Sequence, residues 1–280
     1  MMSEKQKNLI TRSIFGALFV AIMVLGFTRP HYMVVLFAVI TGMTLWEFSG
    51  LVNDQKGISV NRFISTAAGV YFFVAVAGQR MGFVEGFSAY IPYILSIIYL
   101  FIAELYRKQP SPLTNIAWEI AGIVYAAVPM ALFVTLPVAV RGAAIDYSPA
   151  VLLSILFIVW ANDVGAYLFG VAFGRRKLFE RISPNKSWEG FFGGVACAVG
   201  VGMLVALWQD ASVPAWAGAG GIVAVTGVFG DLVESMFKRS VGIKDSGNIL
   251  PGHGGFLDRF DALILALPFV YTYFSIIFTL

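Results

Sequence analysis

The chain has 280 residues, of which 59% are hydrophobic and 12% are charged, and its formal net charge is +3 at pH 7. Its mean hydropathy of +0.81 is too high for a water-soluble domain of this length. This composition excludes a soluble globular protein and indicates an integral membrane protein. The single cysteine, Cys197, excludes an intramolecular disulfide and a cysteine metal site. No segment has the features of a nucleic-acid-binding module.

Nine apolar stretches are long enough to approach or reach the length of a membrane-spanning helix. Backbone polar groups need partners inside a bilayer, which leaves helices or closed barrels, and the long continuous runs favour helices. We therefore expect an all-α polytopic membrane protein, with the first stretch retained as a span. The expected spans are residues 9–27, 32–52, 63–78, 89–105, 116–140, 150–173, 191–208, 216–237 and 262–280.

The positions of lysine and arginine predict the orientation, because basic loops resist translocation. With the N-terminus in the cytoplasm, all but three of the 19 basic residues fall in cytoplasmic segments; the exceptions are Arg29, Arg80 and Arg141. An odd number of spans then places the C-terminus outside. The two long loops, residues 174–190 and 238–261, both fall on the cytoplasmic side.

Acidic residues inside a span are functional candidates, because a charge at membrane depth is costly. The candidates are Glu47, Glu104, Glu119, Asp163, Asp231 and Glu234. Three of them, Glu47, Glu104 and Glu119, lie close to tryptophan or arginine and are expected to have structural or interfacial roles. The roles of Asp163 and Glu234 stay open.

Asp231 is a stronger candidate because Ser235 and Lys238 follow it at i+4 and i+7, on one stripe of a helix. This arrangement predicts a polar face at the end of the eighth span. The alternative is that the span simply ends in water, where Asp231 pairs with Lys238 or Arg239.

The stretch "PGHGGFLDRFD" combines His253 with glycines that let a backbone approach a phosphate closely. Asp258 and Asp261 follow at i and i+3, so both carboxylates can face one point. Together with Asp231 they form a set of hard oxygen donors that suits Mg²⁺. The alternative is that the two acids only favour a helix N-terminus.

The other long loop contains "RRKLFERISPNKSWEG". Its first four cations are interpreted as topology signals or lipid headgroup contacts. "SPNKSWEG" supplies Ser183, Asn185 and Lys186 where a span begins, and this pattern predicts an anion-binding turn. Asp163, in the preceding span, is expected to pair with a loop cation or to assist a metal.

The stretch "SMFKRSVGIKDSGNILPGHGGFLDRFD", residues 235–261, resembles the signature of the phosphatidate cytidylyltransferases, also called CDP-diacylglycerol synthases. "AND" at 161–163 and "SPNKSWEG" at 183–190 extend the resemblance. It is carried by residues 150–280, which are expected to form a catalytic membrane region with the two cytoplasmic loops. Residues 1–149 are expected to form an N-terminal five-helix membrane region.

The resemblance implies transfer of a cytidylyl group from CTP to phosphatidic acid in phospholipid biosynthesis, at the cytoplasmic face of a bacterial inner membrane. It implies Mg²⁺, with a second cation left open, and a homodimer surrounded by membrane lipids. The implied metal ligands are Asp231, Asp258 and Asp261, and the other implied catalytic residues are Lys238, Arg239 and His253. The implied substrate-binding residues are Ser183, Asn185, Lys186, Ser235, Lys244 and Gly254.

Two other functions are compatible with intramembrane acids. CDP-alcohol phosphotransferases also use clustered aspartates, but their "DGxxAR" pattern does not occur here. An ion-coupled transporter would use Asp163, Asp231 and Glu234 as coupling sites, but it would not explain two polar, glycine-bearing loops on one face.

Overall fold

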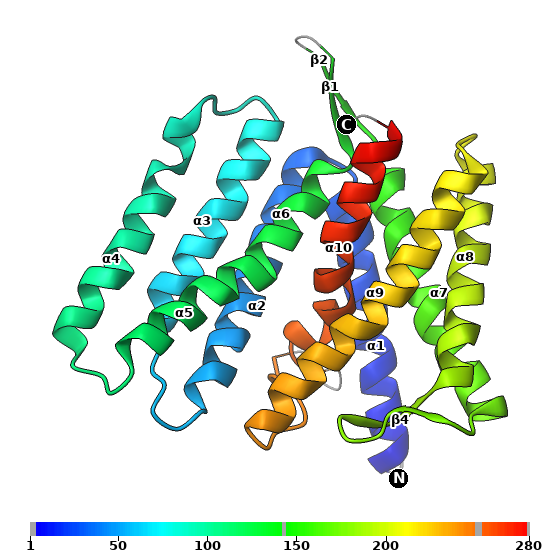
Figure 1. Cartoon of the computed structure of the whole chain (residues 1–280). Helices are drawn as coiled ribbons and strands as arrows, with labels where there is room; N and C mark the ends of the chain where they lie inside the picture. The colour runs from blue at the N-terminus through cyan, green and yellow to red at the C-terminus, as the bar shows by residue number, and fades with distance from the viewer. Residues whose placement is uncertain (1–3, 142–143, 250–253, 279–280) are drawn as a thin grey trace.

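The computed structural model describes the backbone of residues 4–141, 144–249 and 254–278, and the side chains of residues 13–139, 146–249 and 254–278. It is a helical bundle with two short hairpins (Figure 1). The first helices are α1 (Glu4–Phe27), α2 (Pro30–Asn53), α3 (Arg62–Arg80), the 3-10 turn η1 (Phe87–Tyr90) and α4 (Ile91–Arg107). They are followed by α5 (Pro112–Gly122), the π-helical η2 (Ile123–Ala127), α6 (Val128–Thr135), β1 (Val138–Arg141) and β2 (Ala144–Tyr147). The remaining elements are α7 (Pro149–Phe173), β3 (Lys177–Phe179), β4 (Ser183–Ser187), α8 (Trp188–Trp208), α9 (Val213–Ser240) and α10 (Leu257–Phe278).

Each of the nine expected spans corresponds to helical structure, with α5, η2 and α6 forming one continuous helix. Among the described residues, seven helices are long and apolar enough to cross a membrane. The two that fall outside this group are α1, whose described apolar part is Ser13–Phe27, and α3, which begins and ends on an arginine. The chain is therefore an integral membrane protein with several spans.

The protein is all-helical apart from its two short hairpins, but the expectation that the fifth span reaches residue 140 was wrong. This helix ends at Thr135, and Val138–Arg141 pairs antiparallel with Ala144–Tyr147. Pro137 ends the helix because its ring has no N–H to donate, and the valines that follow favour extended backbone. A second hairpin, β3–β4, lies between α7 and α8, where the sequence predicted only a loop and a turn.

Proline sets the start of many of these helices. It occupies one of the first two positions of α2, α5, α7 and α9, where the missing N–H would have no helical partner. The α9 helix also has a side-chain cap, since Ser212 Oγ accepts a hydrogen bond from the Ala215 N–H. The local sequence therefore specifies where the spans begin.

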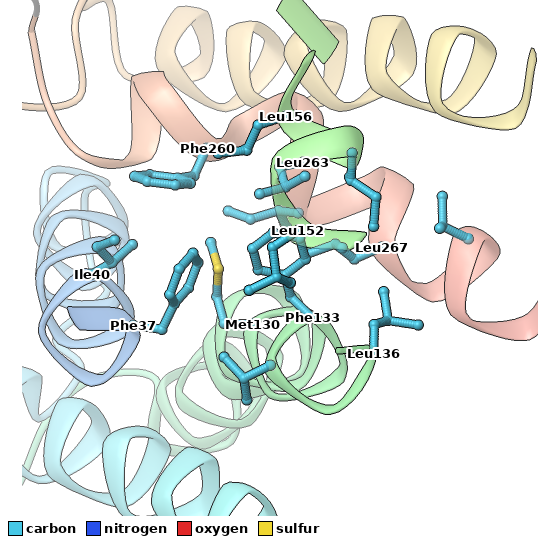
Figure 2. Close-up of a cluster of buried hydrophobic side chains, with 14 of the residues drawn as sticks. Phe37, Ile40, Met130, Phe133, Leu136, Leu152, Leu156, Phe260, Leu263 and Leu267 are labelled. Atoms are coloured by element: carbon cyan, nitrogen blue, oxygen red, sulfur yellow. The ribbon is translucent and has the colours of Figure 1, made fainter. Parts of the chain in front are cut away.

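One hydrophobic core joins the two halves of the chain. Figure 2 shows Phe37 and Ile40 of α2 beside Met130 and Phe133 of α6 and facing α7 and α10. The ring centroids of Phe37 and Phe133 are 5.0 Å apart, and the Phe37 ring also lies 6.3 Å from that of Phe260. The first turn of α10 is thus held against helices from the N-terminal half.

Close helix contacts in the C-terminal half depend on glycine. A Cβ on Gly230 of α9 would lie 3.0 Å from the Ala262 Cα of α10, and closer still to the Asp261 carbonyl oxygen. A Cβ on Gly194 of α8 would lie 2.7 Å from the Asn162 Oδ1 of α7. Small residues let helix backbones approach in this way. The consequence is that Asp231, next to Gly230, lies close to the start of α10.

The polar connections gather at one end of the bundle. Figure 1 shows the start of α1, the β3–β4 hairpin and the α9–α10 connection at that end, with β1–β2 at the opposite end. The α2–α3 and α4–α5 connections lie at the same end as β3–β4. The segments that the basic residues assigned to one side of the membrane are therefore together in space.

Candidate active site

A cavity of about 450 Å³ opens at the polar end of the bundle, between α7, the β3–β4 hairpin, α8, α9 and α10. Four carboxylates line it, those of Asp163, Asp231, Asp258 and Asp261. Three of the predicted substrate-binding residues, Ser183, Asn185 and Lys186, line its other wall. Residues from the two loops singled out in the sequence thus face one another across a single cavity.

Asp231 is bound by groups from two elements. Its Oδ2 lies 2.6 Å from the Lys186 Nζ of β4, and its Oδ1 accepts a hydrogen bond of 3.1 Å from Ser235 Oγ. The predicted helical stripe of Asp231 and Ser235 is confirmed by this contact. The alternative, in which Asp231 pairs with Lys238 or Arg239, is wrong. Asp231 pairs with Lys186, which lies on the other loop.

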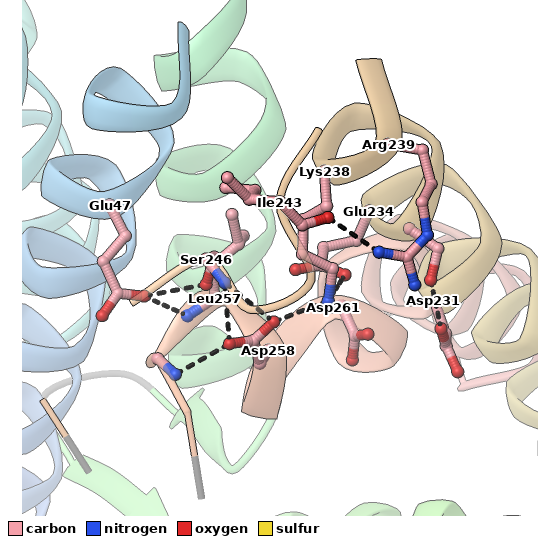
Figure 3. A network of polar contacts seen from close by, with 12 residues as sticks. Glu47, Asp231, Glu234, Lys238, Arg239, Ile243, Ser246, Leu257, Asp258 and Asp261 are labelled. Atoms are coloured by element: carbon pink, nitrogen blue, oxygen red, sulfur yellow. Dashed lines mark hydrogen bonds and ion pairs between the residues drawn. The ribbon is translucent and has the colours of Figure 1, made fainter. Parts of the chain in front are cut away.

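Lys238 lies beneath the cavity rather than in its lining. Its Nζ is 2.6 Å from Asp258 Oδ1 and also forms an ion pair with Glu234, which has no exposed surface (Figure 3). Lys238 itself is only 8% exposed. Two buried carboxylates therefore share its charge. This position indicates that Lys238 holds Asp258 in place, instead of making the predicted contact with substrate phosphate.

Asp258 is fixed by backbone donors as well. Its Oδ2 accepts hydrogen bonds from the N–H groups of Gly255 (2.7 Å) and Ser246 (3.0 Å). Gly254 has φ +80°, and a Cβ there would lie 2.7 Å from the same Oδ2. The glycines of this loop thus allow the backbone to close around Asp258. Asp258 lies in the first turn of α10, as the alternative for this residue predicted, and it also lines the cavity.

Glu47 of α2 also holds this loop. Its Oε2 accepts a hydrogen bond of 2.8 Å from the Leu257 N–H and one of 3.3 Å from Ser246 Oγ (Figure 3). Glu47 is 3% exposed, and both Gly247 and Gly255 pack against its carboxylate. The structural role expected for Glu47 is confirmed, but its partner was not foreseen. The feature of the sequence that pointed to Glu47 was an acidic residue inside an apolar span.

The other two acids of that group also have structural partners. Glu104 forms an ion pair with Arg107, and the Glu119 carboxylate accepts a hydrogen bond from the Asn61 N–H. These contacts lie around the α2–α3 and α4–α5 connections. They confirm the structural role expected for both residues.

Several predicted residues lie away from the cavity lining. Arg239 is exposed, and its Nη1 donates a hydrogen bond of 2.7 Å to the Ile243 carbonyl oxygen. Lys244 is exposed on the α9–α10 connection and does not line the cavity. His253 lies outside the described residues. Conversely, Arg259 lines the cavity but was considered in the sequence only as a cytoplasmic cation.

The donor chemistry of the cavity fits Mg²⁺, which prefers carboxylate oxygens, water and substrate phosphates. Among the described side chains, no three acids or histidines are close enough together to hold one ion. Mg²⁺ commonly binds through one or two carboxylates and completes its shell with water and phosphate oxygens. Asp231 and Asp261 both line the cavity, at the place where Gly230 lets α9 approach α10 closely.

Comparison with known proteins identifies relatives of part of the chain. A phosphatidate cytidylyltransferase of Staphylococcus epidermidis is 50% identical over 117 residues, and one of Staphylococcus aureus is 51% identical over 113 residues. A third, from Staphylococcus saprophyticus, is 47% identical over 117 residues. Each alignment covers 40% of this chain and 44% of the relative, so the matched part spans less than half of each relative's length.

A comparison with protein families covers nearly the whole chain. The match extends from residue 6 to residue 277, and so includes every residue that lines the cavity, on α7, β3–β4, α8, α9 and α10. The family's description agrees with the resemblance that the two loops carry. On this match, the chain belongs to the cytidylyltransferase family.

Proposed function

We propose that this protein is a phosphatidate cytidylyltransferase, which transfers the cytidylyl group of CTP to phosphatidic acid and yields CDP-diacylglycerol and pyrophosphate. The observation that carries the proposal is a cavity at the end of an apolar bundle that combines carboxylates with Lys186 and Arg259. A hydrophilic nucleotide and a lipid headgroup can meet only at such a boundary. Membership of the cytidylyltransferase family and the named staphylococcal relatives support the same reaction.

The reaction requires that two polyanions approach each other. An oxygen of the lipid phosphate forms a bond to the α-phosphorus of CTP, and the bond from that phosphorus to the bridging oxygen of pyrophosphate breaks. The lipid phosphate is already ionised at neutral pH, so no general base is needed. The protein's task is to position the reactants and to offset their charge.

Bound Mg²⁺ would supply positive charge to the phosphates. Asp231 and Asp261 would hold it, with Asp163 as a further carboxylate of the same wall. Asp258, the third ligand predicted from the sequence, lines this cavity but is engaged by Lys238, and we assign it to shaping the site. Lys186 would bind the triphosphate from the hairpin, beside Ser183 and Asn185.

The setting of the enzyme follows from the basic residues. The connections that carry them share the end of the bundle at which the cavity opens, and basic segments stay in the cytoplasm. We therefore assign the active site to the cytoplasmic face of a bacterial inner membrane. The proposal includes a homodimer, with residues 150–280 as the catalytic region and residues 1–149 as the five-helix region that supports it.

The test uses the purified full chain in detergent with α-labelled CTP, phosphatidic acid and Mg²⁺. The expected result is a labelled lipid that migrates as CDP-diacylglycerol, with an equal amount of pyrophosphate. Formation of a labelled lipid only from CDP-diacylglycerol and an alcohol would instead indicate a CDP-alcohol phosphotransferase. Solute movement in proteoliposomes without any lipid product would indicate a transporter. Either of these outcomes would overturn the proposal.

A further inference from the structure

A second cavity, of about 270 Å³, adjoins the acid-lined one and has a different character. Its outer part is formed by Phe15, Gly16, Phe19 and Val20 of α1 and by Val159 and Trp160 of α7. Its inner wall is shared with the first cavity and consists of Asp163, Asp258, Arg259, Asp261 and Ala262. An apolar space and a polar space therefore meet at the start of α10 and at Asp163 of α7.

Arg259 is the basic residue of this shared wall, which also contains three carboxylates. Its side chain is exposed, and within the described parts of the chain it forms no ion pair or side-chain hydrogen bond. The lysines nearby differ in this respect, since Lys186 is paired with Asp231 and Lys238 with Asp258. Arg259 is thus the cation of the wall that is available for an anion, and its planar group suits a phosphate.

The outer side of the second cavity faces the surroundings of the bundle. The cavity-lining helix α1 packs against α2 and α7, and its Phe19 ring lies 6.0 Å from the Phe260 ring of α10. The opposite face of α1 is exposed and apolar, with Ile14 59% and Leu18 51% exposed. In a membrane that face contacts lipid, so α1 is a single-helix wall between the bilayer and the cavity.

We propose that the apolar cavity between α1, α7 and α10 holds the acyl-chain end of the phosphatidic acid substrate and that Arg259 binds its phosphate where the two cavities meet. This inference rests on the proposed function. It makes Arg259 a substrate-binding residue and assigns to α1 the wall beside which the lipid enters.

The arrangement also agrees with the direction of the reaction. In-line transfer needs the attacking oxygen and the leaving group on opposite sides of the α-phosphorus. A lipid phosphate on Arg259 approaches from the side of α1, while Lys186 on the β3–β4 hairpin lies on the other wall of the acid-lined cavity. The pyrophosphate group that leaves with the bond electrons then lies toward Lys186 and the polar opening.

The experiment compares three variants in mixed micelles: Arg259→Ala, Gly16→Leu and the control Ala17→Leu. Gly16 lines the apolar cavity, whereas Ala17 is the next, exposed residue of the same helix and does not line it. We expect Arg259→Ala to raise the KM for phosphatidic acid about tenfold or more, the scale of one lost hydrogen bond to a charged group, with a much smaller change in the KM for CTP. Gly16→Leu should raise the same lipid KM, and Ala17→Leu should behave like the parent.

A binding measurement separates recognition from catalysis and from folding. Thermal unfolding of the parent should shift upward with short-chain phosphatidic acid but not with the corresponding diacylglycerol or with inorganic phosphate. Arg259→Ala should keep the parent's unfolding temperature without lipid and lose the shift, and Arg259→Lys should restore part of it. If Arg259→Ala changes the KM for CTP alone, or if Gly16→Leu matches Ala17→Leu, the inference is overturned. Absence of any labelled lipid from the parent would instead contradict the proposed function.

Discussion

The carboxylate of Glu47 in α2 accepts a hydrogen bond of 2.8 Å from the backbone N–H of Leu257, the first residue of α10. The two residues are 210 positions apart in the chain. Asp258 follows Leu257 directly, so this contact holds one wall of the acid-lined cavity from the N-terminal half of the protein. The first five helices therefore contribute to the site even though the expected chemical groups lie beyond residue 150.

Replacement of Glu47 should lower activity through the position of Asp258. Glu47→Ala leaves the buried Leu257 N–H without a partner, which costs about 1–3 kcal/mol of stability. We expect reduced kcat with little change in the KM for CTP, measured at a temperature where the variant stays folded. Glu47→Gln keeps an acceptor oxygen and should recover part of kcat. Glu104→Gln, which alters the distant pair with Arg107, is the control and should leave kcat unchanged.

Removal of Lys238 should destabilise the protein strongly. Lys238→Met leaves two carboxylates, those of Glu234 and Asp258, buried beside each other without a cation. Loss of one partner from a buried ion pair costs about 3–5 kcal/mol. Thermal unfolding in detergent should show a much lower midpoint, and the double variant Lys238→Met, Glu234→Gln should regain part of it. An unchanged midpoint in the single variant would show that the buried pair is not formed.

Substitution of Asp231 should lower turnover strongly without loss of fold. Asp231→Asn removes a charge from the cavity wall but can keep the contact with Ser235. We expect kcat/KM to fall roughly a hundredfold or more, the scale of losing one charge-stabilising group in an active site. In the same variant, the Mg²⁺ concentration that gives half-maximal activity should rise. Asp210→Asn, at the connection between α8 and α9, is the control and should retain full activity.

Gly254 offers a comparison between backbone strain and a direct clash. Gly254→Ala forces a side chain into positive φ and also into contact with Asp258 Oδ2. Gly57 has φ +79° with nothing within 4 Å of the added Cβ, so Gly57→Ala introduces only the strain, about 1–2 kcal/mol. Both variants should unfold at lower temperature, but only Gly254→Ala should lose most of its kcat. Equal kinetics in the two would remove Gly254 from the site.

Much of the fold could be predicted because lipid imposes simple rules. Long apolar runs must become helices, and prolines such as Pro149 mark where they begin. The residues on the two loops were also found, because polar groups such as Lys186 and Asp231 are conspicuous in an apolar chain. The hairpins were not foreseen, since β3–β4 carries no strong apolar alternation and depends on pairing between Lys177 and Ser187.

The parts of the site that were missed depend on long-range packing. In the sequence Arg259 is one of several cytoplasmic cations. No local pattern indicates that Arg259 lines two cavities, whereas Arg239 donates a hydrogen bond to the Ile243 carbonyl oxygen of the α9–α10 connection. The charge of Lys238 is taken up by Glu234, an i,i+4 neighbour that the sequence did show, and by Asp258, which it did not. A pattern of residue types locates polar groups, but tertiary contacts decide which of them remain available to substrate.

The core shared by Phe37, Phe133 and Phe260 has a consequence for biosynthesis. Membrane helices enter the bilayer from the N-terminal end of the chain, so α10 arrives after α2 and α6. Until then Phe37 of α2, which packs against Phe260, can face lipid tails, which solvate apolar side chains about as well as protein does. Assembly of this core can therefore wait for α10, and the catalytic wall is completed only after that helix has entered the membrane.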